Sequence, residues 1–153
     1  MTLFLSKYIN KIDKKGRISV PSAFRSVLLE QSDFLGIIAY PSFVNSCIEA
    51  CSMNRIKHLS NAIDNLDPYS LEREAFATAI LSGSVQLAFD SEGRITIPED
   101  LLASSNLTDQ ICFVGKGETF ELWEPIKFEE YLAQSRELAK NNRSLLRFNY
   151  KKD

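Results

Sequence analysis

The nine residues D-K-K-G-R-I-S-V-P at positions 13–21 return 77 positions later as D-S-E-G-R-I-T-I-P at positions 90–98. Five of the nine positions are identical, and two more exchange Ser for Thr and Val for Ile. Apolar residues also match upstream at the same offset, where Ile12 corresponds to Phe89. The repeat therefore includes the strand that leads into each copy, and it indicates that the chain consists of two related halves.

Each copy has the pattern of a tight turn between two strands. The first residue, Asp13 or Asp90, can accept a hydrogen bond from the backbone two residues further on. The glycine three residues later, Gly16 or Gly93, can adopt the positive φ that closes a short hairpin with a bulge. The alternation of apolar residues on both sides favours strands, so we predict a hairpin-like turn in each half.

The residues after each turn predict the same series of elements in both halves. Pro21 and Pro98 cannot donate to a sheet, so each ends its strand and is followed by a short helix. The pattern then returns to β, with two strands joined by a turn. The predicted helices cover residues 22–29 and 99–103, and the predicted strand pairs are 34–40 with 46–51 and 111–114 with 119–123.

Helical periodicity appears between the halves and after the second one. Apolar residues at spacings of three and four predict a helix up to Leu66, and a second helix follows Asp67-Pro68. A third helix is predicted to begin at Pro125. The expected organisation is a first half over residues 1–52, a helical insertion over 53–82, a second half over 83–124, and a C-terminal helix with a basic tail over 125–153.

Charge is distributed unevenly along the chain. The 153 residues carry 18 Lys and Arg against 20 Asp and Glu, a net charge of −2. Residues 1–25 hold six basic side chains and one acidic, residues 26–139 hold seven and eighteen, and residues 140–153 hold five and one. Both ends are therefore cationic and the middle is acidic, which predicts a charged partner for one surface.

The composition argues against metal, membrane and enzyme functions. Cys47, Cys51 and His58 lack the fourth ligand and the spacing of a structural zinc site, so we expect no metal or other cofactor. The cysteines are expected to be reduced thiols. No signal peptide or membrane helix is expected, which favours the cytoplasm. With a single histidine and no nucleophile motif, we expect neither catalysis nor a small-molecule substrate; Gly115-x-Gly117 lacks the following helix of a phosphate loop.

The paired D-x-x-G-R-I-[ST]-[VI]-P motifs, together with F-E-L-W-E at residues 120–124, resemble the MraZ family of bacterial transcriptional regulators. The resemblance runs from Phe4 to about Lys140. It implies an α+β fold in which two βαββ-type repeats form an AbrB-like swapped-hairpin double β-barrel. It further implies a ring-shaped homo-oligomer that binds short direct repeats of double-stranded DNA upstream of its own operon, at the start of the division and cell-wall gene cluster. There it would act mainly as a repressor, associated with the nucleoid.

In that family the two turns carry the DNA-facing surface. The resemblance therefore implies DNA-binding roles for Lys14, Lys15, Arg17, Ser91 and Arg94, beside the turn-forming Asp13, Gly16, Asp90 and Gly93. The second turn has Glu92 where the first has Lys15, and a carboxylate repels phosphate, so we expect the first half to supply most of the electrostatic affinity. Arg94 is expected either to read a base or to pair with Asp90. For Arg17 the alternatives to DNA contact are a solvated surface charge or a bridge to Asp13.

Two alternatives remain open from the residues. The basic tail, Lys140, Arg143, Arg147, Lys151 and Lys152, is expected either to touch phosphates or to be a frayed terminus. The chain could also be an antitoxin-like protein-interaction module of the same fold. Such antitoxins usually carry one half per chain and a disordered partner-binding tail, whereas this chain carries both halves and a short tail.

Overall fold

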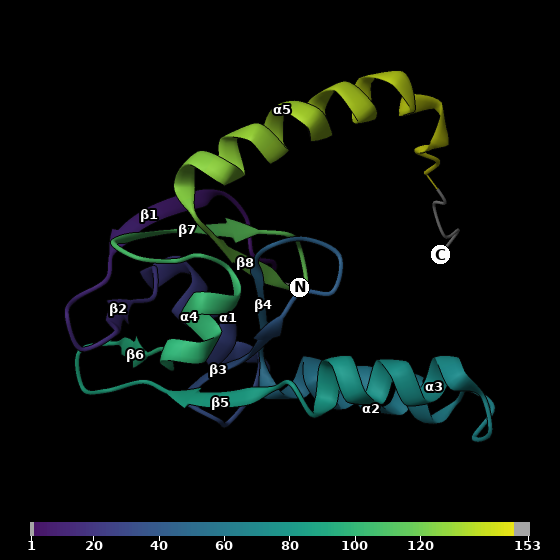
Figure 1. The fold of residues 1–153 in the computed structure, drawn as a ribbon, viewed down its shortest axis with the longest axis horizontal. Coiled ribbons are helices and arrows are strands. Elements are labelled where there is room, and N and C mark those ends of the chain that lie inside the picture. Colours follow the sequence, from purple (N-terminus) through teal and green to yellow (C-terminus); the bar gives the residue numbers. More distant parts are fainter. Residues whose placement is uncertain (1, 149–153) are drawn as a thin grey trace, which may run out of the picture.

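The computed structural model describes residues 2–148 and has a mixed α/β fold built on antiparallel sheets (Figure 1). The larger sheet has the order β1-β7-β8-β4-β3-β5, and a smaller one pairs β2 with β6. The strands are β1 (Lys7–Lys11), β2 (Arg17–Ser19), β3 (Gly36–Pro41), β4 (Ile48–Cys51), β5 (Val85–Ala88), β6 (Arg94–Thr96), β7 (Gln110–Gly115) and β8 (Phe120–Trp123). The helices are α1 (Ser22–Gln31), α2 (Met53–Asp64), α3 (Leu71–Phe76), α4 (Glu99–Ser104) and α5 (Pro125–Asn141).

The strand order corrects one expectation, because the six-stranded sheet is open and not a closed barrel. Its outer strands, β1 and β5, each pair with one neighbour within the described residues, and β2 and β6 form a sheet of their own. The antiparallel α/β character and the two predicted strand pairs, β3 with β4 and β7 with β8, are confirmed. Both short helices that follow the turns are also confirmed, as α1 and α4.

The two halves exchange their first strands. β1 of the first half pairs with β7 of the second, and β5 of the second half pairs with β3 of the first. β4 and β8 join the halves at the centre of the sheet. In neither half do the strands on the two sides of the turn pair with each other, so each half depends on the other for its sheet partners.

A shared core of aromatic side chains lies beneath this sheet. Phe24 on α1 packs edge-on against Phe4, with ring centroids 5.3 Å apart, and its ring is tilted against that of Phe120, with centroids 4.9 Å apart. Tyr8 and Phe113 complete the group around Phe24 at 5.5 and 6.4 Å. These residues come from both halves, so burying α1 stabilises the whole assembly of strands.

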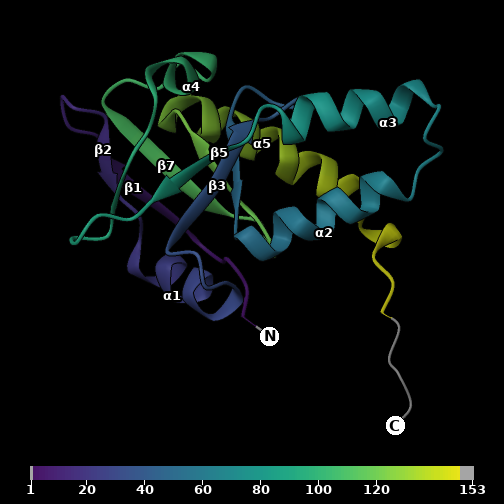
Figure 2. The ribbon, with the colours of Figure 1, turned by 90° about the horizontal axis from the view of Figure 1, so that it is seen from below.

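The helices outside the two halves pack on smaller clusters. α2 and α3 lie side by side and project from the sheet (Figure 2), and Arg73 of α3 bonds Asp64 of α2 at 2.9 Å. The second insertion helix continues as a π-helical turn over Ala77–Leu81, in which the Ser82 N–H donates to the Ala77 carbonyl. α5 begins at Pro125 as predicted, and its Tyr131 stacks on Trp123 at 4.7 Å.

Two expectations from the sequence remain predictions: the division into segments and the role of the whole basic tail. The division into four segments is a prediction that the arrangement of elements does not test. Lys151 and Lys152 of the basic tail lie outside the described residues. Within residues 2–148, no helix combines the length and the apolar character that crossing a bilayer requires.

Truncating Phe24 tests whether the shared aromatic core holds the halves together. Phe24→Ala is expected to lower the free energy of unfolding by about 3 to 5 kcal/mol, because it leaves a cavity among four aromatic rings. Leu29→Ala on the same helix is the control; Leu29 is 55% exposed, and the expected loss is about 0.5 kcal/mol. Denaturant unfolding followed by circular dichroism measures both, and equal losses would contradict this account of the core.

Candidate nucleic-acid interface

The first turn is organised by the carboxylate of Asp13. Its Oδ1 accepts hydrogen bonds from the backbone N–H of Lys15 at 2.9 Å and of Arg17 at 2.8 Å. Its Oδ2 accepts from Nε of Arg17 at 2.7 Å. Gly16 closes the turn with a φ of +79°, a conformation that favours glycine. One carboxylate therefore shapes the backbone and orients the arginine at the same time.

The second turn repeats this geometry. Asp90 Oδ1 accepts from the N–H groups of Glu92 and Arg94 at 2.8 and 2.9 Å, and its Oδ2 accepts from Arg94 Nε at 2.8 Å. Gly93 has a φ of +75°. Arg94 has a further ion-pair partner in Glu92, with Nη1 and Oε2 3.6 Å apart. All four predicted turn-forming residues thus occupy equivalent positions in the two copies.

These bonds change the acidity of the groups involved. The backbone N–H of Arg17 lowers the pKa of Asp13 below its ordinary value of 3.8, and the backbone N–H of Arg94 does the same for Asp90. The hydrogen bond from Arg94 to Asp90 raises the pKa of Arg94, and Glu92 and Asp13 add to that effect. Asp13 belongs to the first turn and Arg94 to the second. The effect of Asp13 on the pKa of Arg94 therefore indicates that the two turns lie close enough to interact.

Backbone pairing brings the two turns together. β2 and β6 are antiparallel, with Ile18 opposite Ile95 and Ser19 opposite Arg94. The carbonyls of the two turn glycines accept hydrogen bonds across the pair, Gly93 O from the N–H of Val20 at 3.2 Å and Gly16 O from that of Ile97 at 2.9 Å. The pair lies at the end of the molecule opposite α2 and α3 (Figure 1).

The alternation of strand residues puts the two arginines on one face. Ile18 and Ile95 are each 1% exposed and face the core. Arg17 and Arg94 therefore point to the opposite face of the two-stranded sheet, where they are diagonal neighbours across the pair. The arrangement presents two oriented guanidinium groups on one short β-ribbon.

The remaining predicted contact residues lie at the tips of the turns. Lys14 and Lys15 are exposed in the first turn, and Ser91 is exposed in the second. Within residues 2–148 the two lysines form no ion pair. Both arginines, in contrast, pair with the aspartate of their own turn. Nε makes these bonds, and the Nη groups of Arg17 have no partner in the described chain.

Sequence reasoning missed one residue of this surface, Arg25. It lies on α1, eight residues after Arg17, and its guanidinium packs on Gly93 of the second turn. A Cβ built on Gly93 would lie 2.7 Å from Cζ of Arg25. The pairing of β2 with β6 brings this arginine to that turn, and no local pattern signals the contact.

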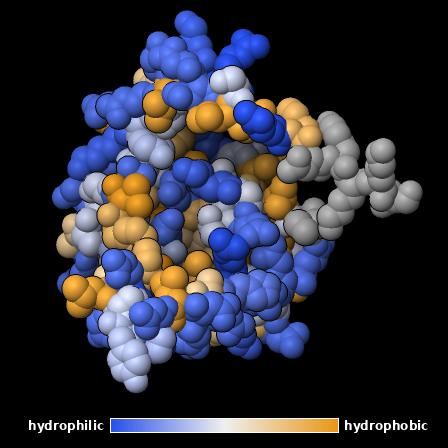
Figure 3. Space-filling view, turned by 90° about the vertical axis from the view of Figure 1, so that its right-hand side faces the viewer, coloured by the Kyte–Doolittle hydropathy of each residue, from blue (hydrophilic) through white to orange (hydrophobic). Residues whose placement is uncertain are grey.

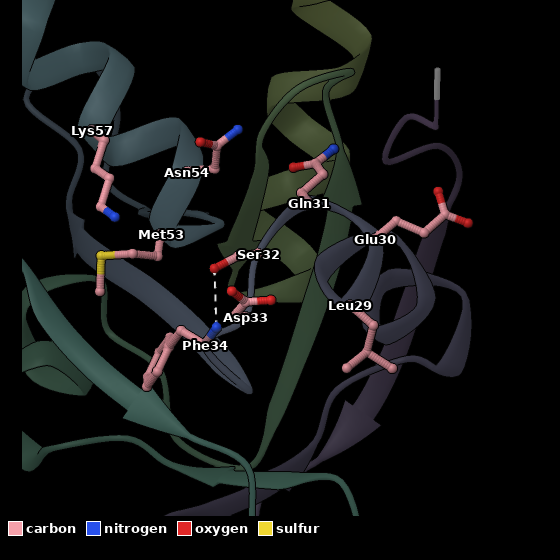
Figure 4. Close-up of a pocket in the computed structure, with 9 residues that line it drawn as sticks. All are labelled: Leu29, Glu30, Gln31, Ser32, Asp33, Phe34, Met53, Asn54 and Lys57. Carbon is pink, nitrogen blue, oxygen red and sulfur yellow. Dashed lines mark hydrogen bonds between the residues drawn. The ribbon is translucent and has the colours of Figure 1, made fainter.

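The rest of residues 2–148 offers no comparable grouping of cationic side chains on one ribbon. A hollow of about 440 Å³ opens between the end of α1 and the start of α2, with Glu30 and Lys57 on opposite sides (Figure 4). Its one hydroxyl, that of Ser32, accepts a hydrogen bond from the Phe34 N–H at 3.1 Å and so caps the local loop. Within residues 2–148 no group of three or more His, Cys, Asp or Glu side chains is placed to hold a metal ion.

The two cysteines considered as metal ligands are buried free thiols. Cys47 and Cys51 are each 1% exposed, and burial raises the pKa of each to about 12. Protonated thiols in apolar surroundings are inert, so these residues act as small core side chains.

The lowered pKa of Asp13 predicts an acid-dependent stability of the turn. Because the folded pKa lies below the unfolded value of 3.8, the carboxylate stabilises the fold above pH 4, and this contribution is lost as the pH falls through the folded pKa. The thermal midpoint of Asp13→Asn should lie below that of the parent at pH 6, and the difference should shrink between pH 4 and pH 2. Asp33→Asn, on an exposed loop, is the charge-matched control; a difference for Asp13→Asn that is constant with pH would contradict the assignment.

Comparison with known proteins shows the family to which the chain belongs. Residues 80–148 match the family model described as "MraZ protein, putative antitoxin-like". A protein of Rickettsia bellii (strain OSU 85-389) named "Transcriptional regulator MraZ" is 53% identical over 148 residues, which cover 96% of this chain and 98% of that protein. Relatives of the same name from Rickettsia canadensis and Rickettsia rickettsii are each 50% identical over 147 residues, again 96% of this chain and 98% of theirs. Half of all residues are thus shared over almost the full length, and the chain belongs to the MraZ family.

Proposed function

We propose that this protein is a sequence-specific DNA-binding transcriptional regulator that contacts DNA through its two D-x-x-G-R turns. The observation that carries the proposal is the pair of turns itself: two arginines, each held by an aspartate, side by side on one β-ribbon. The relatives' printed name, which describes transcriptional regulation, supports the same role. The exchange of strands between the halves supports a swapped-hairpin relationship without requiring a closed barrel.

The geometry suits the major groove of DNA. A two-stranded ribbon fits this groove, and a guanidinium can bond O6 and N7 of guanine as a pair. Asp13 engages Nε of Arg17 and leaves the Nη groups for such a contact. Lys14 and Lys15 at the tip are placed to meet phosphates, which position the protein but carry no sequence information. In the second turn, Ser91 and Arg94 take the equivalent places.

A ring-shaped homo-oligomer is part of the proposal, and exposed apolar side chains support it. Phe43 in the β3–β4 loop is 57% exposed and packs near Phe76 of α3, with ring centroids 6.1 Å apart. Leu71 of α3 and Leu138 of α5 are 85% and 67% exposed. Figure 3 looks onto the side from which α2 and α3 project, and hydrophobic patches lie there among hydrophilic surface. Such patches commonly mark sites of association.

A ring gives the turns a way to read repeated sites. Subunits related by rotation in a head-to-tail ring present identical surfaces in the same direction, and so suit direct repeats. Repeats about 10 base pairs apart lie on one side of the duplex. Several weak contacts on one particle then combine, raising the overall affinity by about 100-fold or more. A ring on promoter DNA of its own operon would repress by blocking polymerase, which requires neither catalysis nor a small ligand.

One alternative function has an observation in its favour. The matching family model is described as antitoxin-like, and its match covers the second half and α5. An antitoxin would hold a partner protein in a fixed ratio. Purification from native cells distinguishes the two, because a stoichiometric second protein would support the antitoxin-like module and its absence with retained DNA binding would support the regulator.

Replacing Arg17 tests the proposed base contact. Arg17→Ala is expected to weaken binding to a fragment from upstream of the protein's own gene by about 10- to 100-fold, and to reduce the preference over scrambled DNA. Lys14→Ala should weaken binding to both DNAs equally and lower the salt slope by about one unit. Fluorescence anisotropy at several salt concentrations measures both. Equal affinity of the parent protein for the two DNAs would refute sequence-specific binding.

The spacing of repeats tests the ring. Inserting five base pairs between two direct repeats places the second on the opposite side of the duplex and should reduce affinity about 100-fold, whereas inserting ten should restore most of it. Light scattering of the free protein provides the mass of the particle. A monomeric particle, or affinity that ignores spacing, would contradict the ring.

A further inference from the structure

We infer that Arg25 of α1 is a further DNA-contacting residue, which serves the second turn by binding a backbone phosphate; the inference rests on the proposed function. The second turn lacks the two lysines of the first and carries Glu92, so its own side chains sum to a charge of −1 against +2 for the first. Arg25 adds the missing cation from a different element of the fold.

The position of Arg25 is defined by close packing on Gly93. A Cβ on Gly93 would lie 2.7 Å from Cζ and 3.0 Å from Cδ of Arg25, so the side chain lies against the bare face of the glycine. Gly93 is buried as a result, whereas Gly16 of the first turn is only half-buried. The glycine of the second turn therefore has two roles: it permits the positive φ, and it makes room for a guanidinium.

Arg25 is an unpaired cation, unlike the two arginines of the turns. Its Nε is buried and has no hydrogen-bond partner among residues 2–148, and its side chain forms no ion pair in that part of the chain. Asp90 and Ser91 line the same hollow of about 240 Å³, yet Asp90 is committed to Arg94. A guanidinium that no internal carboxylate neutralises is the group expected to bind an external anion.

The equivalent position beside the first turn lacks such a cation. At the repeat offset of 77 residues, Arg25 corresponds to Leu102 on α4. Leu102 lines the hollow beside the first turn together with the carboxylates Glu99 and Asp109. The first turn thus has lysines at its tip and acids behind it, whereas the second has an acid at its tip and an arginine behind it.

This placement assigns Arg25 to a phosphate and not to a base. The side chain is partly buried behind the turn, in a hollow that Leu29, Leu35 and Phe89 also line. A cation behind the tip of a ribbon that enters a groove faces the phosphates at the edge of the groove. Arg25 is therefore expected to raise affinity for all sequences alike, in contrast to Arg17.

Arg25→Leu, which installs the residue found at the equivalent position, tests the inference. It should weaken binding to the upstream fragment and to scrambled DNA by the same factor, about 10-fold, and lower the salt slope by about one unit. Arg25→Lys should keep the slope, and adding Glu92→Lys to Arg25→Leu should restore it. Arg136→Leu on α5 is the control for net charge, and circular dichroism and light scattering check folding and assembly.

Several outcomes would overturn the inference while leaving the proposed function standing. One is unchanged binding by Arg25→Leu when Arg17→Ala loses affinity. Another is a loss equal to that of Arg136→Leu, which would reduce the effect to net charge. If Arg25→Leu proves unfolded, Arg25→Gln keeps a polar side chain on Gly93 and removes the charge, and a salt slope equal to that of the parent would then refute the phosphate contact.

Discussion

The backbone pairing of β2 with β6 is the contact on which the rest of the structure depends. One hydrogen bond joins each turn glycine to the residue directly after the strand that follows the other turn, and Ile18 and Ile95 are buried opposite each other in the pair. Since β2 and β6 pair with each other, β1 and β5 find their partners in the opposite half. The same contact that creates the shared core therefore creates the ribbon that carries both arginines.

Within each turn, an aspartate offsets the charge of the arginine and fixes the position of its side chain. Asp13 and Asp90 each pair with the arginine of their turn, which reduces the net charge that the turn offers to DNA. In return, the arginine is held by Nε before any ligand arrives, so less side-chain entropy is lost on binding. The first turn also carries Lys14 and Lys15, whereas the second turn carries no lysine, and the inferred role of Arg25 rests on this difference.

The features that could be predicted from sequence are the local ones. The Asp-to-Gly spacing predicts the two turns because the residues that form each turn are neighbours in the chain. The helices after Pro21 and Pro98 and the strand pair β3 with β4 are likewise encoded within short windows. Which strand pairs with which across the halves is decided by burial of a common core, and periodicity carries no information about it. Arg25 was missed for this reason, because its contact joins residues far apart in the chain; the closed barrel, which the family resemblance implied, is wrong because the six-stranded sheet stays open.

The proposed binding of DNA by an acidic protein needs an explanation of its own. Residues 26–139 carry eleven more acidic than basic side chains, and the first 25 residues carry five more basic than acidic. DNA that approaches the acidic middle of the chain would therefore meet repulsion, which lowers non-specific affinity. With few phosphate contacts per subunit, useful affinity has to come from several subunits engaging repeated sites at once. The acidic residues 26–139 would therefore favour specificity, because they penalise orientations that bring the acidic surface against DNA.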